Sequence, residues 1–368
     1  MAFDAVRGQP AAVDVLTRAL ASGRVAHAYA FVGPPGVGRK LTAIEFAKAL
    51  LCPHPMPSPP LTLPLPSGER RRGEGHWVGG EDKGEGVMVR VNACGTCPSC
   101  RRVEAGIHPD FMLIAPTFPE GKTSGTLLIR IEAIRQLEQR AALCPAEGAW
   151  KVFIVDDAGR MTAEAPQAFL KTLEEPPART VIILILTQTR ELPATVISRC
   201  QVVRFMPLHE EEAVSLLRSR GIDEPTARVL ARASQGRPGL ALAQDPAAWL
   251  ERRERALSIL ADVGADGATA VFKWGETLGR DRAQMEQLIE TWWLWYRDLL
   301  CAKAGGDPRL FIYGDRAAEL TRDAAARSWD SIVGGLAACR EAWQALQRNV
   351  TPRLTLEVML SRLVLEAA

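Results

Sequence analysis

Two kinds of apolar pattern alternate over the first half of the chain. Short apolar runs, of the length that a buried strand needs, occur at residues 28–32, 111–114, 151–157 and 181–186. Between these runs, apolar residues recur at three- or four-residue spacing, as on one face of a helix, at residues 3–23, 41–51, 129–143 and 165–175. Strands that alternate with helices predict an α/β domain built on a parallel sheet.

The strand-like runs stop near Glu210, and only helical patterns follow. We expect helices at residues 210–220, 224–234, 248–263, 282–303, 315–325, 330–347 and 354–366. Trp292 and Trp295 fall on the apolar face of one of them, so we interpret them as core or subunit-interface packing rather than as a ligand site. The change of pattern predicts an α/β domain at 1–206, a small helical domain at 207–246 and a larger helical domain at 247–368.

Residues 53–93 interrupt the α/β pattern. Prolines dominate the first part of this segment and glycines the second, with a charge run at 69–72. No apolar periodicity crosses it, so we predict a disordered or poorly ordered surface insertion. Its basic run would suit contact with nucleic acid, although a solvated loop is the more common interpretation.

Composition and charge are those of an ordinary globular protein. The 368 residues suggest two or three domains, and 45 basic against 43 acidic residues give a net charge of +2. Such a balance does not indicate a dedicated polyanion binder. The N-terminus lacks the pattern of a secretory signal, and the apolar runs are too short to span a membrane. We therefore expect a cytoplasmic protein, whose eight cysteines are metal ligands or buried thiols rather than disulfides.

A glycine loop follows the first predicted strand. Residues 33–40 read GPPGVGRK, close to the nucleotide-binding pattern G-x-x-x-x-G-K-[ST], and keep the glycines Gly33, Gly36 and Gly38. Arg39, however, stands where the lysine belongs, and Lys40 stands where a hydroxyl would hold Mg²⁺. The loop therefore predicts the scaffold of a nucleotide site without its full chemistry, so that binding of ATP and magnesium is weak or absent.

Acidic and polar residues follow two of the other strands. Asp156 fits the acid that holds Mg²⁺ opposite a phosphate loop, and Asp157 stands where many related ATPases carry a glutamate. Thr187 follows the strand at 181–186 and is a further candidate. Arg199 comes after a proline-containing loop. A lone arginine is usually a surface residue, but here it would suit an arginine finger for the γ-phosphate of a neighbouring subunit.

Three cysteines lie within seven residues, at Cys94, Cys97 and Cys100. Their C-x₂-C-x₂-C spacing suits tetrahedral zinc, which needs a fourth ligand. Cys52, at the end of the helix after the glycine loop, is the best candidate, and His54 and His108 are alternatives. We therefore predict a structural zinc module within 52–100, with redox chemistry as the lesser alternative.

These motifs occur together in an order that resembles the bacterial clamp-loader branch of the AAA+ superfamily. The resemblance also rests on segments at 3–9, 25–31, 169–177 and 198–201, and on Asn349-Val350-Thr351-Pro352-Arg353-Leu354 near the C-terminus. Within this branch the altered Arg39 and Lys40 favour the catalytically degenerate delta prime family over the working gamma/tau ATPases. Asp157 agrees, and so does Gly239, which stands where the branch carries a second sensor arginine.

The resemblance implies an AAA+ α/β domain with an inserted zinc module, a helical lid and an all-α collar that oligomerises. It implies a subunit that helps to load a sliding clamp onto primed DNA and supplies Arg199 in trans to a gamma/tau ATPase. The implied partners are the gamma/tau and delta subunits, the sliding clamp and, through the complex, primer-template DNA, with no membrane contact. This subunit of the DNA polymerase III holoenzyme would have no ATPase activity of its own.

Two other classes of function stay open at this point. One is a catalytically active gamma/tau-like ATPase, in which Arg39 or Lys40 replaces the missing groups. The other is a zinc-dependent nucleic-acid-binding protein that uses the cysteines and the basic run at 69–72.

Overall fold

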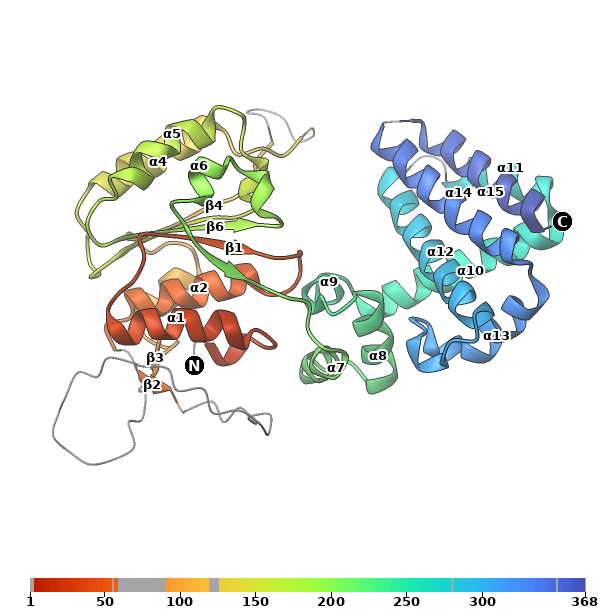
Figure 1. Cartoon of the computed structure of the whole chain (residues 1–368), viewed down its shortest axis with the longest axis horizontal. Helices are drawn as coiled ribbons and strands as arrows, with labels where there is room; N and C mark the ends of the chain where they lie inside the picture. Colours follow the sequence, from red (N-terminus) through yellow and green to blue (C-terminus); the bar gives the residue numbers. More distant parts are fainter. Residues whose placement is uncertain are drawn as a thin grey trace. The chain divides into compact units, whose positions relative to one another are not determined.

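The computed structural model describes residues 3–54, 56–58, 90–118, 126–278, 281–348 and 350–367. The chain forms two compact units, Met1–Pro207 and Leu208–Ala368, and each is described by itself. Figure 1 shows a sheet flanked by helices in the first unit and helices in the second. The prediction of an α/β region followed by a helical region is therefore confirmed.

A five-stranded parallel sheet organises the first unit, in the order β4-β5-β6-β1-β7. The strands are β1 (Ala28–Val32), β4 (Phe111–Ile114), β5 (Lys151–Val155), β6 (Thr180–Leu186) and β7 (Gln201–Arg204). In the register, Ala28 lies opposite Ile182 on one side of β1, and Tyr29 lies opposite Gln201 on the other. All pairings are parallel, so the carboxyl ends of the strands share one edge of the sheet.

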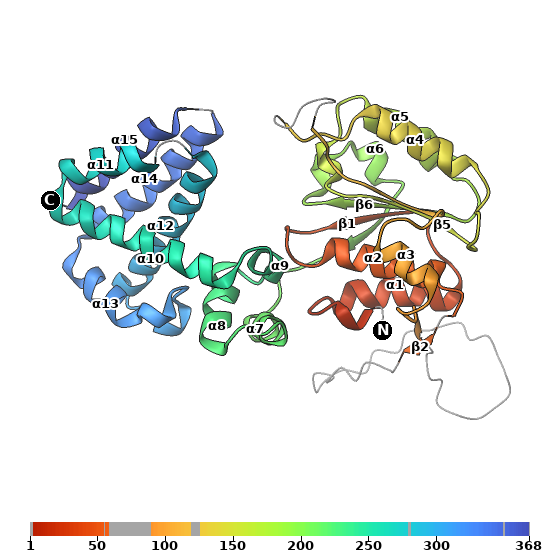
Figure 2. The same cartoon turned by 180° about the vertical axis from the view of Figure 1, so that it is seen from behind.

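Helices cover both faces of this sheet, as Figures 1 and 2 show. One face packs against α1 (Pro10–Ser22) and α2 (Arg39–Leu51), and the other against α4 (Ile131–Ala142) and α5 (Ala165–Glu174). Successive strand residues enter opposite cores: Ile183 joins the first and Leu184 the second. Burial on both faces explains why these strands are continuous apolar runs rather than alternating ones.

A small antiparallel ladder lies beside the α1–α2 face. Strand β2 (Met56–Ser58) pairs with β3 (Arg90–Asn92), and Met56 lies opposite Asn92. The predicted insertion at 53–93 falls largely outside the described residues. Its two ends, however, meet in this ladder, so Cys52 and Cys94 are brought to the same place despite the long segment between them.

The second unit is built from helices in the part of it that the structure describes. They are α7 (Glu210–Ser219), α8 (Glu224–Ala233), α9 (Pro238–Leu242), α10 (Pro246–Asp266), α11 (Ala268–Leu278), α12 (Arg282–Lys303), α13 (Ala317–Ala326), α14 (Trp329–Gln347) and α15 (Pro352–Ala367). Two apolar cores form, one among α7–α9 and one mainly among the later helices, which Val229 of α8 also joins. Trp249 packs against both. The division at 246/247 stays a prediction.

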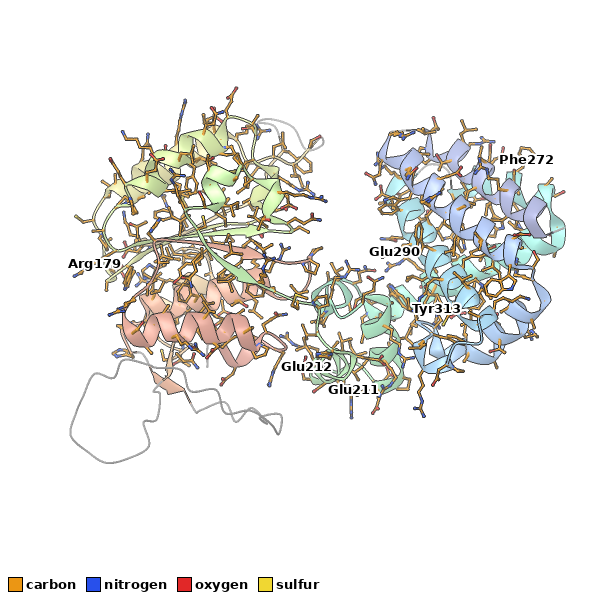
Figure 3. All side chains as sticks on the ribbon, viewed as in Figure 1. Arg179, Glu211, Glu212, Phe272, Glu290 and Tyr313 are labelled. Carbon is orange, nitrogen blue, oxygen red and sulfur yellow. The ribbon has the colours of Figure 1, made fainter. Side chains whose placement is uncertain are left out.

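The tryptophan-rich helix α12 packs as the sequence predicts. Trp292 is fully buried, and its Nε1 donates to the carbonyl of Ala256 at 2.7 Å. Trp295 is buried as well. Figure 3 shows Tyr313 within this unit, whereas Phe272 is exposed at its surface. No helix in the described ranges is both long and apolar enough to cross a membrane.

The tight contact at Gly33 gives the first prediction. A Cβ on Gly33 would lie 2.3 Å from the backbone oxygen of Phe205, which follows β7 and cannot move away freely. We expect Gly33→Ala to lower the free energy of unfolding by about 1–3 kcal/mol, as overpacking does. Gly264→Ala in α10 is the control, because nothing lies within 4 Å of that position. It should raise stability by about 0.5–1 kcal/mol. Urea unfolding followed by circular dichroism measures both, and an unchanged Gly33→Ala protein would contradict the contact.

Candidate functional site

The glycine loop keeps the backbone of a phosphate loop. It leaves β1 at the carboxyl edge of the sheet, and the N–H of Gly33 donates to the carbonyl of Leu186 at the end of β6 at 3.1 Å. Gly36 and Gly38 have φ angles of 84° and 98°, which strongly favour glycine. Gly38 also precedes the first residue of α2. The strand–loop–helix geometry that the glycines predict is therefore present.

Arg39 is directed to the base of the loop. Its Nη1 donates to the carbonyl of Leu186, the same oxygen that accepts from Gly33. Burial lowers the pKa of Arg39, and nearby carboxylates oppose this shift: Asp156, Asp157 and Glu191. The guanidinium thus neutralises acids at the edge of the sheet and binds a protein carbonyl, instead of extending freely from the loop as a phosphate-binding lysine does.

Lys40 forms a salt bridge with the acid that was expected to hold magnesium. Its Nζ lies 2.9 Å from Oδ2 of Asp156, and the two side chains are 47% and 23% exposed. Lys40 stands at the loop position where a hydroxyl would coordinate the metal. The two positions that would supply magnesium ligands are therefore joined by an ammonium group, which has donors only and cannot ligate a cation.

The other candidates at this edge also have partners. Asp157 has a φ of 51° and pairs with Nε of Arg160 at 2.5 Å. The N–H of Thr187 donates to Oε2 of Glu191 at 2.9 Å. The structure thus brings the loop, both aspartates and Thr187 to one edge of the sheet. Sequence reasoning missed Arg160, Glu191 and the Leu186 carbonyl. Glu191 and the Leu186 carbonyl come close to the loop only because the folded sheet places β6 beside β1.

Arg199 lies at the opposite edge. It lies in the turn two residues before β7, whose first residue, Gln201, pairs with Tyr29, whereas the glycine loop begins after Val32. At about 3.3 Å per strand residue, the start of β7 is already roughly 13 Å from the start of the loop along the strands, beyond the reach of an arginine side chain. Nη1 of Arg199 donates to the carbonyl of Thr195 at 2.7 Å, and Nη2 donates to Oε1 of Glu174 at 2.6 Å.

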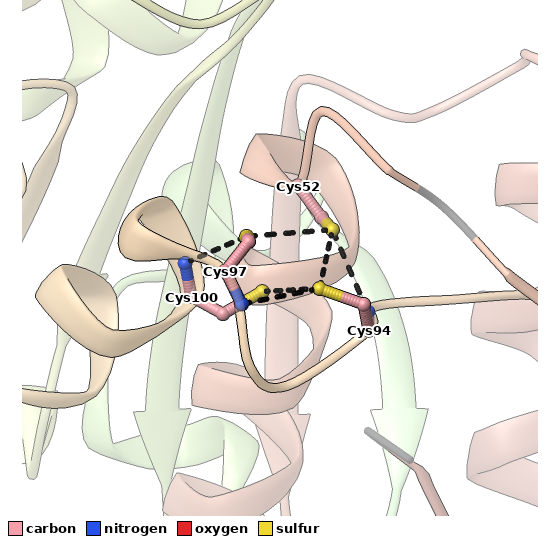
Figure 4. A group of neighbouring side chains, drawn as sticks. All are labelled: Cys52, Cys94, Cys97 and Cys100. Carbon is pink, nitrogen blue, oxygen red and sulfur yellow. Dashed lines mark hydrogen bonds between the residues drawn. The ribbon is translucent and has the colours of Figure 1, made fainter.

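The four predicted cysteines form one cluster, shown in Figure 4. The Sγ atoms of Cys52, Cys94, Cys97 and Cys100 all lie within 4.8 Å of one another. Cys52 is 3.6 Å from Cys94 and 3.9 Å from Cys97, and Cys94 is 4.0 Å from Cys100. Four thiolates at the Zn–S bond length would be about 3.8 Å apart in a tetrahedron, so this donor set fits a metal ion such as zinc.

The backbone around the cluster supports thiolate ligands. The N–H of Cys97 donates to Sγ of Cys94, and the N–H of Cys100 donates to Sγ of Cys97, both at 3.4 Å. The N–H groups of Thr96 and Cys97 lower the pKa of Cys94 to about 6. Burial instead raises the pKa of Cys52 and of Cys100. Gly95, with a φ of 74°, makes the turn between Cys94 and Cys97.

Neither histidine alternative joins the cluster. His54 is exposed, and His108 is buried, with its Nδ1 accepting from the N–H of Asp110 at 3.1 Å.

A contact that sequence reasoning missed links the cysteine module to α2. Nζ of buried Lys48 lies 2.9 Å from Glu45 and 3.3 Å from Glu104, the last residue of α3 (Pro98–Glu104). The three-residue spacing of Glu45 and Lys48 is the feature of the sequence that could have indicated this contact.

Known proteins match most of this chain. The family model described as "DNA polymerase III, delta subunit" matches residues 8–61 and 86–209, which include the glycine loop, the cysteines and Arg199. The delta′ subunit of DNA polymerase III from Bacillus subtilis (strain 168) is 26% identical over 346 residues, which are 93% of this chain and 92% of that protein. The delta′ subunit from Escherichia coli (strain K12) is 31% identical, over 62% of this chain and 58% of its own length.

A second group of relatives carries the name tau. The tau subunit of DNA polymerase III from Bacillus subtilis (strain 168) is 27% identical over 64% of this chain, which corresponds to 35% of its own length. This chain is therefore similar to about a third of that protein.

The buried His108 gives a pH prediction. Burial, and secondarily the charge of Arg102, lowers the pKa of His108, although Asp110 and Glu147 oppose the shift. As the pH falls below about 6.5, His108 is therefore protonated in the unfolded chain before it is protonated in the folded protein. The free energy of unfolding decreases over this range, until the pH reaches the lower pKa of His108 in the folded state. His108→Asn removes this group. We expect the difference in unfolding free energy between the wild type and the variant to shrink from about pH 7.5 to pH 5.5. Urea unfolding at several pH values measures it, and a constant difference would contradict a neutral buried histidine.

Proposed function

Because this chain belongs to the delta prime family of DNA polymerase III clamp-loader subunits, we propose that it assists ATP hydrolysis in a neighbouring subunit without hydrolysing ATP itself. In this proposal it joins gamma/tau and delta subunits, and the assembly loads the sliding clamp onto primer-template DNA. Arg199 extends into the ATP site of a gamma/tau neighbour and stabilises the charge that develops on the γ-phosphate.

The placement of Arg199 carries this proposal. It lies at the edge of the sheet away from its own glycine loop and is 35% exposed, so a second protein can reach it. Two of its five N–H donors bind Thr195 and Glu174, and the other three have no partner among the described residues. The side chain is thus held in place while donors stay free for a phosphate.

The chain's own loop supports the same division of labour. Lys40 and Arg39 are bound to Asp156 and to the carbonyl of Leu186. Gly239 lies in α9 and has no side chain to contribute as a sensor. Nucleotide binding by this subunit is therefore weak or absent.

The cysteine cluster has a structural role in this proposal. Zinc bound by Cys52, Cys94, Cys97 and Cys100 would join the end of α2 to the start of α3. Four protein ligands leave no open position for a substrate, which is typical of structural rather than catalytic zinc.

An active gamma/tau-like ATPase is the second candidate. The observation that favours it is the retained loop backbone, with Gly36 and Gly38 at positive φ, together with the similarity to tau subunits. It requires Arg39 and Lys40 to leave their present partners when nucleotide binds. ATP turnover by the purified chain alone, abolished by Asp156→Ala, would establish this candidate and refute the preferred one.

Removal of the finger tests the preferred function. In a loader reconstituted with gamma/tau and delta subunits, we expect Arg199→Ala to slow hydrolysis at the neighbouring site by about 10²-fold or more. Arg199→Lys should not restore it, because an ammonium lacks the planar fork. Arg228→Ala is the matched control, since Arg228 is also 35% exposed and paired with glutamates. Gel filtration should show intact assembly throughout. Normal hydrolysis in an assembled Arg199→Ala loader would refute the role in trans.

The metal content of the full chain tests the zinc proposal. We expect roughly one zinc per chain by mass spectrometry of the purified protein, and a large loss of zinc and of thermal stability in Cys52→Ser. Cys144→Ser should keep both, because Cys144 is exposed and lies outside the cluster. A metal-free wild type that unfolds at the same temperature as the zinc-loaded protein would contradict a structural site.

A further inference from the structure

The end of the glycine loop does not fit the magnesium ion that a complete loop holds. In a complete site, a hydroxyl on the loop and an acid at a strand end coordinate Mg²⁺ between the phosphates. Here the loop position is Lys40, and its ammonium is 2.9 Å from Asp156. We propose that Lys40 is a specificity-determining residue that takes the place of the metal and excludes magnesium–nucleotide complexes from this subunit's loop.

Charge and geometry both support this exclusion. Mg²⁺ needs oxygen ligands at about 2.0–2.1 Å in an octahedral arrangement, and a lysine supplies none. A divalent cation that approached Asp156 would meet the ammonium at contact distance, where like charges repel. The side chain of Asp156 is 23% exposed, so the ammonium shields a largely covered carboxylate rather than a freely solvated one.

The neighbouring acid does not restore the site. Asp157 is bound to Arg160 at 2.5 Å, on the same turn after β5. Arg39, for its part, donates to the Leu186 carbonyl. Each charged group that a metal–nucleotide complex would need is thus already bound to an opposite charge or to a carbonyl. The pair that occupies the two magnesium-ligand positions is Lys40 with Asp156.

This inference deepens the proposed function, because it names what keeps the subunit's own site inactive. Its test uses the isolated full chain and needs no neighbour. If Arg199→Ala leaves hydrolysis in the reconstituted loader unchanged, the proposed function is refuted but the role of Lys40 is not. If the Lys40→Thr variants gain no binding of Mn²⁺–ATP, the role of Lys40 is refuted but the proposed function is not.

The experiment measures Mn²⁺, a paramagnetic substitute for Mg²⁺, by electron paramagnetic resonance in the presence and absence of ATP. The variants are Lys40→Thr, which restores the hydroxyl, and the double variant Arg39→Lys with Lys40→Thr. Arg39→Lys alone shows the contribution of that position. Adding Asp156→Asn to each Lys40→Thr variant removes the proposed ligand. Lys171→Thr is the charge-matched control, because Lys171 is an exposed lysine on α5.

We expect the wild type, Arg39→Lys and Lys171→Thr to leave Mn²⁺–ATP free. Lys40→Thr, or the double variant, should bind it at least tenfold more tightly than the wild type, and Asp156→Asn should abolish the gain. Circular dichroism confirms that each variant is folded. The inference is overturned if neither Lys40→Thr variant gains binding, if the gain survives Asp156→Asn, or if the wild type, Arg39→Lys or Lys171→Thr binds equally well.

Discussion

The parallel pairing of β1 with both β6 and β7 is the constraint on which the rest of the first unit depends. It places the residues that follow β1, β5 and β6 at one edge of the sheet and those that precede β7 at the other. Groups that resemble a nucleotide site and the exposed Arg199 therefore cannot act on the same phosphate within one chain. Strand direction thus separates Arg199 from the chain's own loop, as the proposed action of Arg199 on a neighbouring subunit requires.

The cysteine module depends on a second constraint, which is local. The β2–β3 ladder brings the two ends of a long segment together, so that Cys52 reaches the three cysteines that follow β3. Buried Lys48 then connects α2 to Glu104 at the end of α3. The entropy cost of closing a loop rises only slowly with its length, which explains why a long segment between Cys52 and Cys94 is tolerated. The proposed zinc ion would therefore stabilise the same junction that this helix packing stabilises.

Much of this arrangement could be predicted from the sequence, and the exceptions have physical reasons. Strands buried on both faces, such as β6, are apolar throughout and easily recognised. Strand β7 was not predicted, because within Gln201–Arg204 only Val203 is buried. Helix α11 was not predicted because Gly267 alone separates it from α10. The ion pair of Lys40 with Asp156 could not be predicted either, since its partner is chosen by the fold and not by spacing in the chain.

The first glycine of the loop has a structural role that does not depend on a nucleotide. Gly33 packs against the backbone of Phe205 too closely for any side chain. The amide of buried Gln9 donates to the carbonyl of Val37 in the loop at 3.3 Å and to the carbonyl of Met206 at 2.6 Å. Loop, N-terminal segment and the exit of β7 are therefore one packed unit. Substitutions at Arg39 and Lys40 change the chemistry of the loop and spare this packing, whereas loss of Gly33 would disturb the sheet itself. A glycine pattern of this kind is thus evidence for the fold, whereas in our proposal the residues at its end decide whether the fold can bind a metal–nucleotide complex.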